Sequence, residues 1–150
     1  MAVAPLNKVR EVVEYALTVI PAEKIHLGIP NYGYDWTLPY VRGESKAVTL
    51  GNVEATQLAI TNGVPIQYDE VALSPFFRYN TATNAGFPES EPYTEHEVWF
   101  EDARSINEKL ALAEEYNLRG FSCWQIMELF RPLWLLSADR FTINKTPFTF

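Results

Sequence analysis

Residues 24–36 read KIHLGIPNYGYDW, and this stretch decides the predicted fold. Its first half, Lys24 to Pro30, is a short apolar run that predicts a buried strand. A helical pattern from Pro5 to Ile20 precedes it after only a very short connection. A helix that leads straight into an apolar strand is typical of the parallel sheets of α/β proteins. The second half, Asn31 to Trp36, is a cluster of polar and aromatic residues where this strand ends.

The same order of elements returns near the C-terminus. A short strand is expected at Glu97 to Phe100, followed by a helix from Glu101 to about Tyr116. The apolar run Gly120 to Trp124 predicts a second buried strand, and Arg131 to Ser137 predicts a short helix. Because the adjacent acids Glu101-Asp102 point apart at a helix start, we expect them to cap the helix rather than to act as a catalytic pair.

The middle of the chain follows a different pattern. Leu50 to Thr61 predicts a helix, and Pro65 to Val71 with Phe76 to Tyr79 predicts an antiparallel hairpin. Thr81 to Thr94 is rich in turn-forming residues and predicts a loop. A block of this length is too long for a simple connection, so we expect an inserted α+β subdomain at 37–97. Residues 1–36 and 98–150 would then form the α/β part.

Composition and charge narrow the function classes. The chain has 150 residues and a formal net charge of -7, which disfavours nucleic acids and anionic membrane surfaces as partners. No apolar run approaches the roughly 20 residues that a membrane span needs. Cys123 has no second cysteine to pair with, and its apolar neighbours favour a small buried side chain over a reactive thiol. His26 and His96 are isolated, so neither a metal site nor a cofactor is expected.

Aromatic residues are unusually frequent, with nine Phe, eight Tyr and four Trp. Many stand beside Pro, Gly or Asn, where loops are expected. Aromatic rings above a rigid sheet suit sugar binding, because the C–H face of a pyranose lies flat on a ring. The same rings would equally serve to pack loops onto the core, and composition alone leaves both interpretations open.

Three motifs in order carry a resemblance to a known family. Residues 24–36 resemble the seventh barrel strand of glycoside hydrolase family 18. Residues 98–102, VWFED, followed by Ser105 and Lys109, resemble the segment that leads into the last barrel helix. Residues 118–124, LRGFSCW, resemble the eighth strand with its closing tryptophan. The resemblance implies an α/β fold, namely the C-terminal portion of a (β/α)8 barrel (strands 7 and 8) with a small α+β insertion.

The resemblance also implies a function for the protein from which such a chain derives. Members of the family, including the spore peptidoglycan hydrolases that this chain resembles, cleave β-1,4 links next to N-acetylglucosamine in peptidoglycan or chitin. The substrate's acetamido oxygen attacks the anomeric carbon while a glutamic acid protonates the leaving oxygen. That acid belongs to an Asp-x-x-Asp-x-Glu run, and no such run occurs in these 150 residues. We therefore expect this chain alone to be inactive, within a parent protein that works outside the cytoplasm at the cell wall or spore coat and cortex.

Five residues are candidates for substrate binding on the same grounds. Trp124 matches the family's tryptophan that floors the subsite of the reacting sugar, and Tyr32 and Trp36 follow the seventh strand beside it. Arg78 and Glu70 fall in the insertion, which walls one side of the cleft in the family. Loop packing and surface ion pairs would also explain Trp36, Arg78 and Glu70.

Two further interpretations remain open. The chain could be a non-catalytic carbohydrate-binding module that uses Trp124 and its aromatic loops. It could also be a self-associating unit, because a partial barrel exposes strand edges that the other barrel strands would pair. The first interpretation predicts saturable binding of N-acetylglucosamine oligomers, and the second predicts dimers or larger assemblies.

Overall fold

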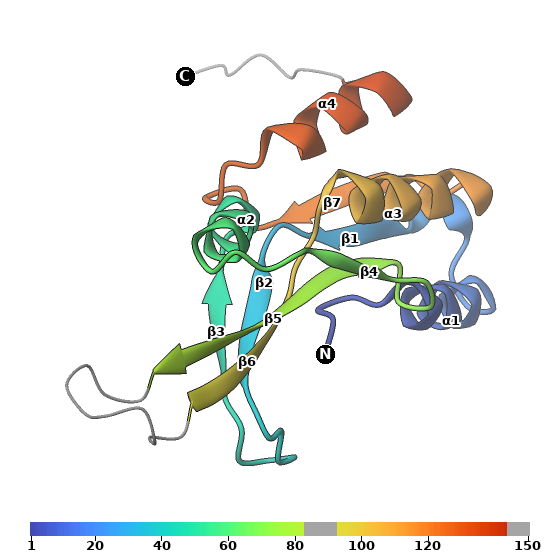
Figure 1. Ribbon diagram of the computed structural model, residues 1–150. Coiled ribbons are helices and arrows are strands. Elements are labelled where there is room, and N and C mark those ends of the chain that lie inside the picture. Colours follow the sequence, from blue (N-terminus) through green and yellow to red (C-terminus); the bar gives the residue numbers. More distant parts are fainter. Residues whose placement is uncertain (83–92, 144–150) are drawn as a thin grey trace, which may run out of the picture.

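The computed structural model describes residues 1–82 and 93–143, which form two sheets and four α-helices (Figure 1). The elements in chain order are α1 (Leu6–Leu17), a 3-10 turn (Ala22–Lys24), β1 (His26–Pro30), β2 (Gly33–Thr37), β3 (Ala47–Leu50), α2 (Asn52–Thr61), β4 (Gln67–Asp69), β5 (Ser74–Ala82), β6 (Tyr93–Trp99), α3 (Ala103–Glu115), β7 (Gly120–Trp124) and α4 (Arg131–Arg140). Within this part of the chain, no helix is long and apolar enough to span a membrane.

The first sheet is the parallel pair of β1 and β7, so the predicted α/β content is confirmed. Its register runs from His26 opposite Gly120 to Pro30 opposite Trp124. β7 has the predicted bounds, whereas β1 begins two residues later than predicted because Ala22–Lys24 form a 3-10 turn. Since the strands are parallel and in register, their C-terminal ends lie at one edge, which brings together the residues that follow each strand.

Helices cover one face of the parallel pair. Leu27 packs in a core cluster with residues of α1 and α3, and Ile29 packs in a second cluster with residues of α3 and α4. Figure 1 shows α3 and α4 on the same side of β1 and β7. The opposite face is uncovered in the described residues, and the side chains that alternate onto it are exposed. Those residues are His26, Gly28, Ser122 and Trp124.

The second sheet is antiparallel and has the strand order β3-β2-β6-β5-β4. The predicted hairpin of β4 and β5 is confirmed, with Gln67 opposite Phe76. Helix α2 covers one face of the sheet, and the shared core there is centred on Phe77 and Val98, both fully buried. The inner face also holds a polar contact, in which the Tyr79 hydroxyl donates to Asp35 Oδ2 at 2.6 Å.

The antiparallel sheet extends beyond the predicted 37–97 block at both ends. The cluster of polar and aromatic residues after β1 contains β2, which begins at Gly33, and the predicted strand at Glu97 to Phe100 is the end of β6. β6 pairs antiparallel with β2 and β5, so it does not continue the parallel pair. β3 was not predicted. Of the loop expected at 81–94, residues 81–82 and 93–94 belong to strands, and residues 83–92 lie outside the described part.

Gly33 marks the point where the chain passes from the parallel pair into the antiparallel sheet. A Cβ atom at this position would lie 2.6 Å from both Phe100 Cβ and Trp99 O. Real Cβ atoms do not approach backbone oxygens this closely, so only glycine fits without displacement of β2 from β6.

The helix ends follow local capping chemistry. Asp102 accepts hydrogen bonds from the backbone N–H of Arg104 at 2.9 Å and of Ser105 at 3.1 Å, which confirms its predicted capping role. α3 is followed by Asn117 in a left-handed conformation with φ 49°, a common way for a helix to end. α4 extends three residues beyond the predicted Ser137, and its last residue, Arg140, pairs with Glu114 of α3.

We predict that the isolated chain self-associates through the open edge of β1 and the apolar groove beside it. The groove is lined by Val9, Val12, Val13, Ala16, Ile25, His26, Leu27 and Gly28. Sedimentation at rising concentration should give masses above the 17.2 kDa monomer. Val12→Lys should shift the distribution toward monomer, because Val12 is 66% exposed and a charge would be desolvated in a packed interface.

Asn7→Lys is the matched control, since it adds the same charge at an exposed position of α1 outside this groove. A wild-type chain that stays monomeric at all concentrations would contradict the prediction.

Candidate functional site

The candidate site is a groove at the C-terminal ends of β1 and β7. It is lined by Tyr32, Tyr34, Thr49, Trp124 and Gln125. Tyr32 follows β1, Trp124 ends β7, and the pairing of Pro30 with Trp124 explains why the two aromatic side chains share one groove. Trp124 is 73% exposed, so its indole is accessible to a ligand. The peptide bond between Trp124 and Gln125 is cis.

A row of aromatic rings extends from this groove along β2. Ring centroids are 5.5 Å apart for Tyr32 and Tyr34, 5.8 Å for Tyr34 and Trp36, and 5.4 Å for Trp36 and Tyr40, all edge-on. Edge-to-face pairs of this kind stabilise one another beyond the area they bury. The Trp36 indole also donates to Met1 O at 3.3 Å. Trp36 therefore belongs to the row but does not line the groove that contains Trp124.

Tyr34 was not predicted as a site residue, although the sequence carried a signal for it. Tyr32, Tyr34 and Trp36 alternate with other residues, and a period of two places side chains of a strand on one face. Burial, followed by the neighbouring Tyr34 phenol, raises the pKa of Tyr32, so its hydroxyl stays protonated and can donate at neutral pH.

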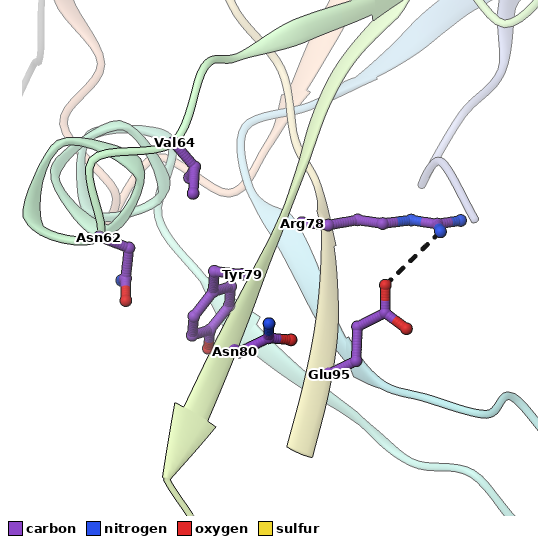
Figure 2. Close-up of a pocket in the computed structure, with 6 residues that line it drawn as sticks. All are labelled: Asn62, Val64, Arg78, Tyr79, Asn80 and Glu95. Atoms are coloured by element: carbon purple, nitrogen blue, oxygen red, sulfur yellow. Dashed lines mark ion pairs between the residues drawn. The ribbon is translucent and has the colours of Figure 1, made fainter. Parts of the chain in front are cut away.

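Arg78 lies on a different part of the antiparallel sheet. Its guanidinium pairs with Glu97 at 2.7 Å and with Glu95 at 3.5 Å. Figure 2 shows Arg78 extending away from the Tyr79 ring, joined to Glu95. The surrounding pocket is lined by Asn62, Val64, Arg78, Tyr79, Asn80 and Glu95, none of which lines the groove of Trp124. Within the described residues, Arg78 and Trp124 thus belong to separate concavities.

Glu70 is also placed away from the groove. It is exposed in the turn between β4 and β5, next to Asp69, which accepts from the backbone N–H of Val71 at 2.9 Å and of Ala72 at 2.6 Å. The same turn is tied to α1, because the Leu6 N–H donates to Ala72 O at 2.8 Å. The structure therefore brings Tyr32 together with Trp124, and Trp36 near them, but not Glu70.

A buried ion pair joins α3 to the residue that precedes its N-cap. Lys109 Nζ lies 2.8 Å from Glu101 Oε2, and both side chains are only 1% exposed. The prediction that Glu101 caps the helix was wrong: Asp102 alone takes that role, while Glu101 turns into the core. Burial raises the pKa of Glu101, and the charge and hydrogen bond of Lys109 oppose this effect. The helical spacing of Lys109 brings its amine back to the carboxylate that precedes the helix.

Side chains of the kinds that bind metals do not cluster in the described residues. There, no group of three or more His, Cys, Asp or Glu side chains is placed to hold a metal ion. Cys123 is half-buried, and burial raises the pKa of its thiol, which disfavours the reactive thiolate.

The comparison with protein families matches residues 2–128 to glycosyl hydrolases family 18. This chain belongs to that family. The cortical fragment-lytic enzyme of Bacillus subtilis (strain 168) is 48% identical over 147 residues, which are 98% of this chain and 32% of that protein. The class V chitinase CHIT5 of Lotus japonicus is 32% identical over 118 residues, or 71% of this chain and 26% of that protein.

A solved family 18 structure agrees with the fold. The spore cortex-lytic enzyme SleL of Bacillus megaterium QM B1551 superposes with a TM-score of 0.85 at 46% sequence identity, covering 98% of this chain and 32% of that one. The chain thus spans about a third of the length of the family 18 relatives it matches. Its fold is that of a part of a family 18 domain.

The buried ion pair generates a stability prediction. Lys109→Met should lower the free energy of unfolding by about 3 kcal/mol or more, because it leaves the Glu101 carboxylate buried without a partner. Urea unfolding measures this loss. The double variant Glu101→Leu with Lys109→Met should be less destabilised than Lys109→Met alone, since no unpaired charge remains. A loss in the double variant equal to the sum of the losses in Lys109→Met and Glu101→Leu would show that the charges are not coupled.

The pair of Arg78 and Glu97 generates a pH prediction. Burial opposes ionisation of Glu97, but hydrogen bonds from Trp99 and Arg78 outweigh it and lower its pKa below the ordinary 4.5. A lowered folded-state pKa stabilises the fold above the ordinary value, and this stabilisation is lost as pH falls through the lower value. Glu97→Gln should therefore unfold at a lower temperature than wild type at pH 7.

That difference should shrink as the pH falls below 4.5, the ordinary pKa. Thermal unfolding monitored by circular dichroism measures it. The control Glu70→Gln changes an exposed turn residue and should follow wild type throughout. A Glu97→Gln difference that does not vary with pH would contradict the assignment.

Proposed function

We propose that this chain forms the C-terminal part of the saccharide cleft of a family 18 glycosidase that acts on β-1,4-linked N-acetylglucosamine polymers. The observation that supports this most directly is the exposed Trp124 ring at the end of β7, in a groove with Tyr32 and Tyr34. The names of the relatives point to peptidoglycan of the spore cortex and to chitin as substrates. In this proposal β1 and β7 are the seventh and eighth strands of the barrel, and the antiparallel sheet with α2 is its insertion.

Each aromatic residue has a distinct role in the proposed cleft. The indole of Trp124 offers a flat apolar surface on which the C–H face of the reacting sugar stacks. Tyr32 stands beside it with a protonated hydroxyl that can donate to a sugar oxygen. Trp36 continues the row away from the groove and would meet a neighbouring sugar of a longer chain. Arg78 and Glu70 lie outside this groove and would contact more distant parts of the polymer.

Catalysis requires a proton donor that this sequence does not carry. In the family the acetamido oxygen of the substrate is the nucleophile, so a single acid is needed to protonate the leaving oxygen. The Asp-x-x-Asp-x-Glu run that holds this acid is not among the 150 residues. We propose that the chain binds the sugar and that chemistry needs residues from outside it.

A second candidate function is a self-sufficient carbohydrate-binding module. One observation favours it: the groove and the aromatic row are assembled entirely from residues of this chain. Such a module would bind oligomers tightly without any other polypeptide. A part of a cleft should bind them weakly, because the remaining walls of the subsites are absent.

The proposed function is tested by hydrolysis and binding assays on the isolated chain. Incubation with N-acetylglucosamine oligomers should release no new reducing ends, whereas release would contradict the proposal. Titration with the tetramer should change tryptophan fluorescence weakly, and Trp124→Ala should abolish the change. Trp134→Ala is the matched control, since Trp134 is 41% exposed on α4 but does not line the groove.

The outcomes separate the alternatives. Tight, saturable binding at low oligomer concentration would favour the binding module. A response that survives in Trp124→Ala would show that Trp124 is not the sugar platform.

A further inference from the structure

Asn31, the residue that follows β1, is fully buried and binds the backbone of the segment after Trp124. Its own N–H donates to Trp124 O at 2.6 Å. Its side-chain Nδ2 donates to Gln125 O at 3.1 Å and also to Glu128 O. One polar residue therefore holds three carbonyl groups of residues 124–128, the segment that carries the exposed ring.

Asn31 is itself held in place by a buried chain of hydrogen bonds. Asn52 Nδ2, at the first turn of α2, donates to Asn31 Oδ1 at 3.3 Å. Asn52 Oδ1 in turn accepts from the Glu101 backbone N–H at 3.0 Å. The Glu101 carboxylate is bound by Lys109 of α3 at 2.8 Å. These four residues are at most 1% exposed. Their hydrogen bonds therefore form a continuous buried series from α3, through α2, to the segment after Trp124.

The geometry explains how an exposed ring can be held in one orientation. At 73% exposure, the Trp124 indole has little packing that could fix it. Its backbone, by contrast, is anchored from the buried side through the Asn31 contacts. A buried polar group that loses its partner costs about 1–3 kcal/mol, so a shift of the segment would leave the buried donors of Asn31 unsatisfied.

We propose that Asn31 is a positioning residue for the Trp124 platform, and that Asn52 and the Glu101–Lys109 pair hold Asn31 in the donating orientation. The effect of this positioning on sugar binding rests on the proposed function. The positioning itself is a property of the ligand-free chain and is tested without any sugar.

The rival explanation is that Asn31 only stabilises the core. A core residue would change the global stability and leave the local state of Trp124 in the folded protein unchanged. The two explanations therefore differ in a spectroscopic property of one side chain, which a stability measurement alone would not detect.

The test uses the full chain labelled with 5-fluorotryptophan. The chain has four tryptophans, so the fluorine NMR spectrum has four resonances, which Trp→Phe variants assign. Asn31→Leu keeps the side-chain size but removes both donors and the acceptor. We expect the Trp124 resonance of this variant to shift and broaden, while the Trp134 resonance on α4 stays in place.

Leu112→Ala is the matched control. Leu112 is 1% exposed in the cluster shared by α1, β1 and α3, so its truncation lowers stability without touching residues 124–128. We expect its Trp124 resonance to coincide with that of wild type. Should Asn31→Leu fail to fold, Asn52→Ala gives a milder version, since Asn31 keeps its donors and loses only the partner that orients it.

Two results would overturn the inference: an unchanged Trp124 resonance in a folded Asn31→Leu or Asn52→Ala variant, or an equal change in Leu112→Ala. Sugar binding separates this failure from failure of the proposed function. If the tetramer perturbs the wild-type Trp124 resonance, Asn31→Leu should weaken its affinity about tenfold, as loss of roughly one hydrogen-bond energy implies. If no oligomer perturbs that resonance, the proposed function fails, and the ligand-free spectra still decide the role of Asn31.

Discussion

The in-register parallel pairing of β1 with β7 is the constraint on which the rest of this structure depends. It joins two segments more than ninety positions apart and sets Pro30 opposite Trp124. Because the strands are parallel, the chain leaves β1 after Pro30 and must cross back to the opposite edge to enter β7 at Gly120. The antiparallel sheet, α2 and α3 make up this connection. The groove forms where the C-terminal ends of β1 and β7 meet. The position of the candidate groove thus follows from strand pairing.

The core next to the C-terminal end of β1 is unusually polar. Asn31, Asn52, Glu101 and Lys109 are enclosed where a typical core would hold aliphatic side chains. Buried polar groups are tolerated because each finds a partner, and no described buried side-chain nitrogen or oxygen lacks one. Such a network contributes less net stability than apolar packing would, but it allows few alternative arrangements. In this chain it coincides with the junction of the two sheets.

The sequence predicted the elements whose signals are local. β7 and α3 follow from an apolar run and a helical repeat, and Asp102 follows from the chemistry of helix starts. β2 was missed although its residues alternate as in a strand, because its partners β3 and β6 lie further along the chain and nothing within residues 31–36 reveals them. Likewise, polar residues such as Asn31 and Glu101 are ordinarily exposed, so their burial follows only from contacts with Asn52 and Lys109. Tyr32 and Trp124 were predicted as site residues because a family motif, and not a local pattern, marked them.

The missing side chain at Gly33 has a consequence for how this surface can diversify. Because Phe100 and the Trp99 carbonyl occupy the space that a methyl group would need, only a hydrogen atom fits at the Cβ position of Gly33. The neighbouring residues Tyr32 and Tyr34 instead place their rings in the candidate groove. Adaptation to a new polymer can therefore change the rings at positions 32 and 34, whereas position 33 must remain glycine.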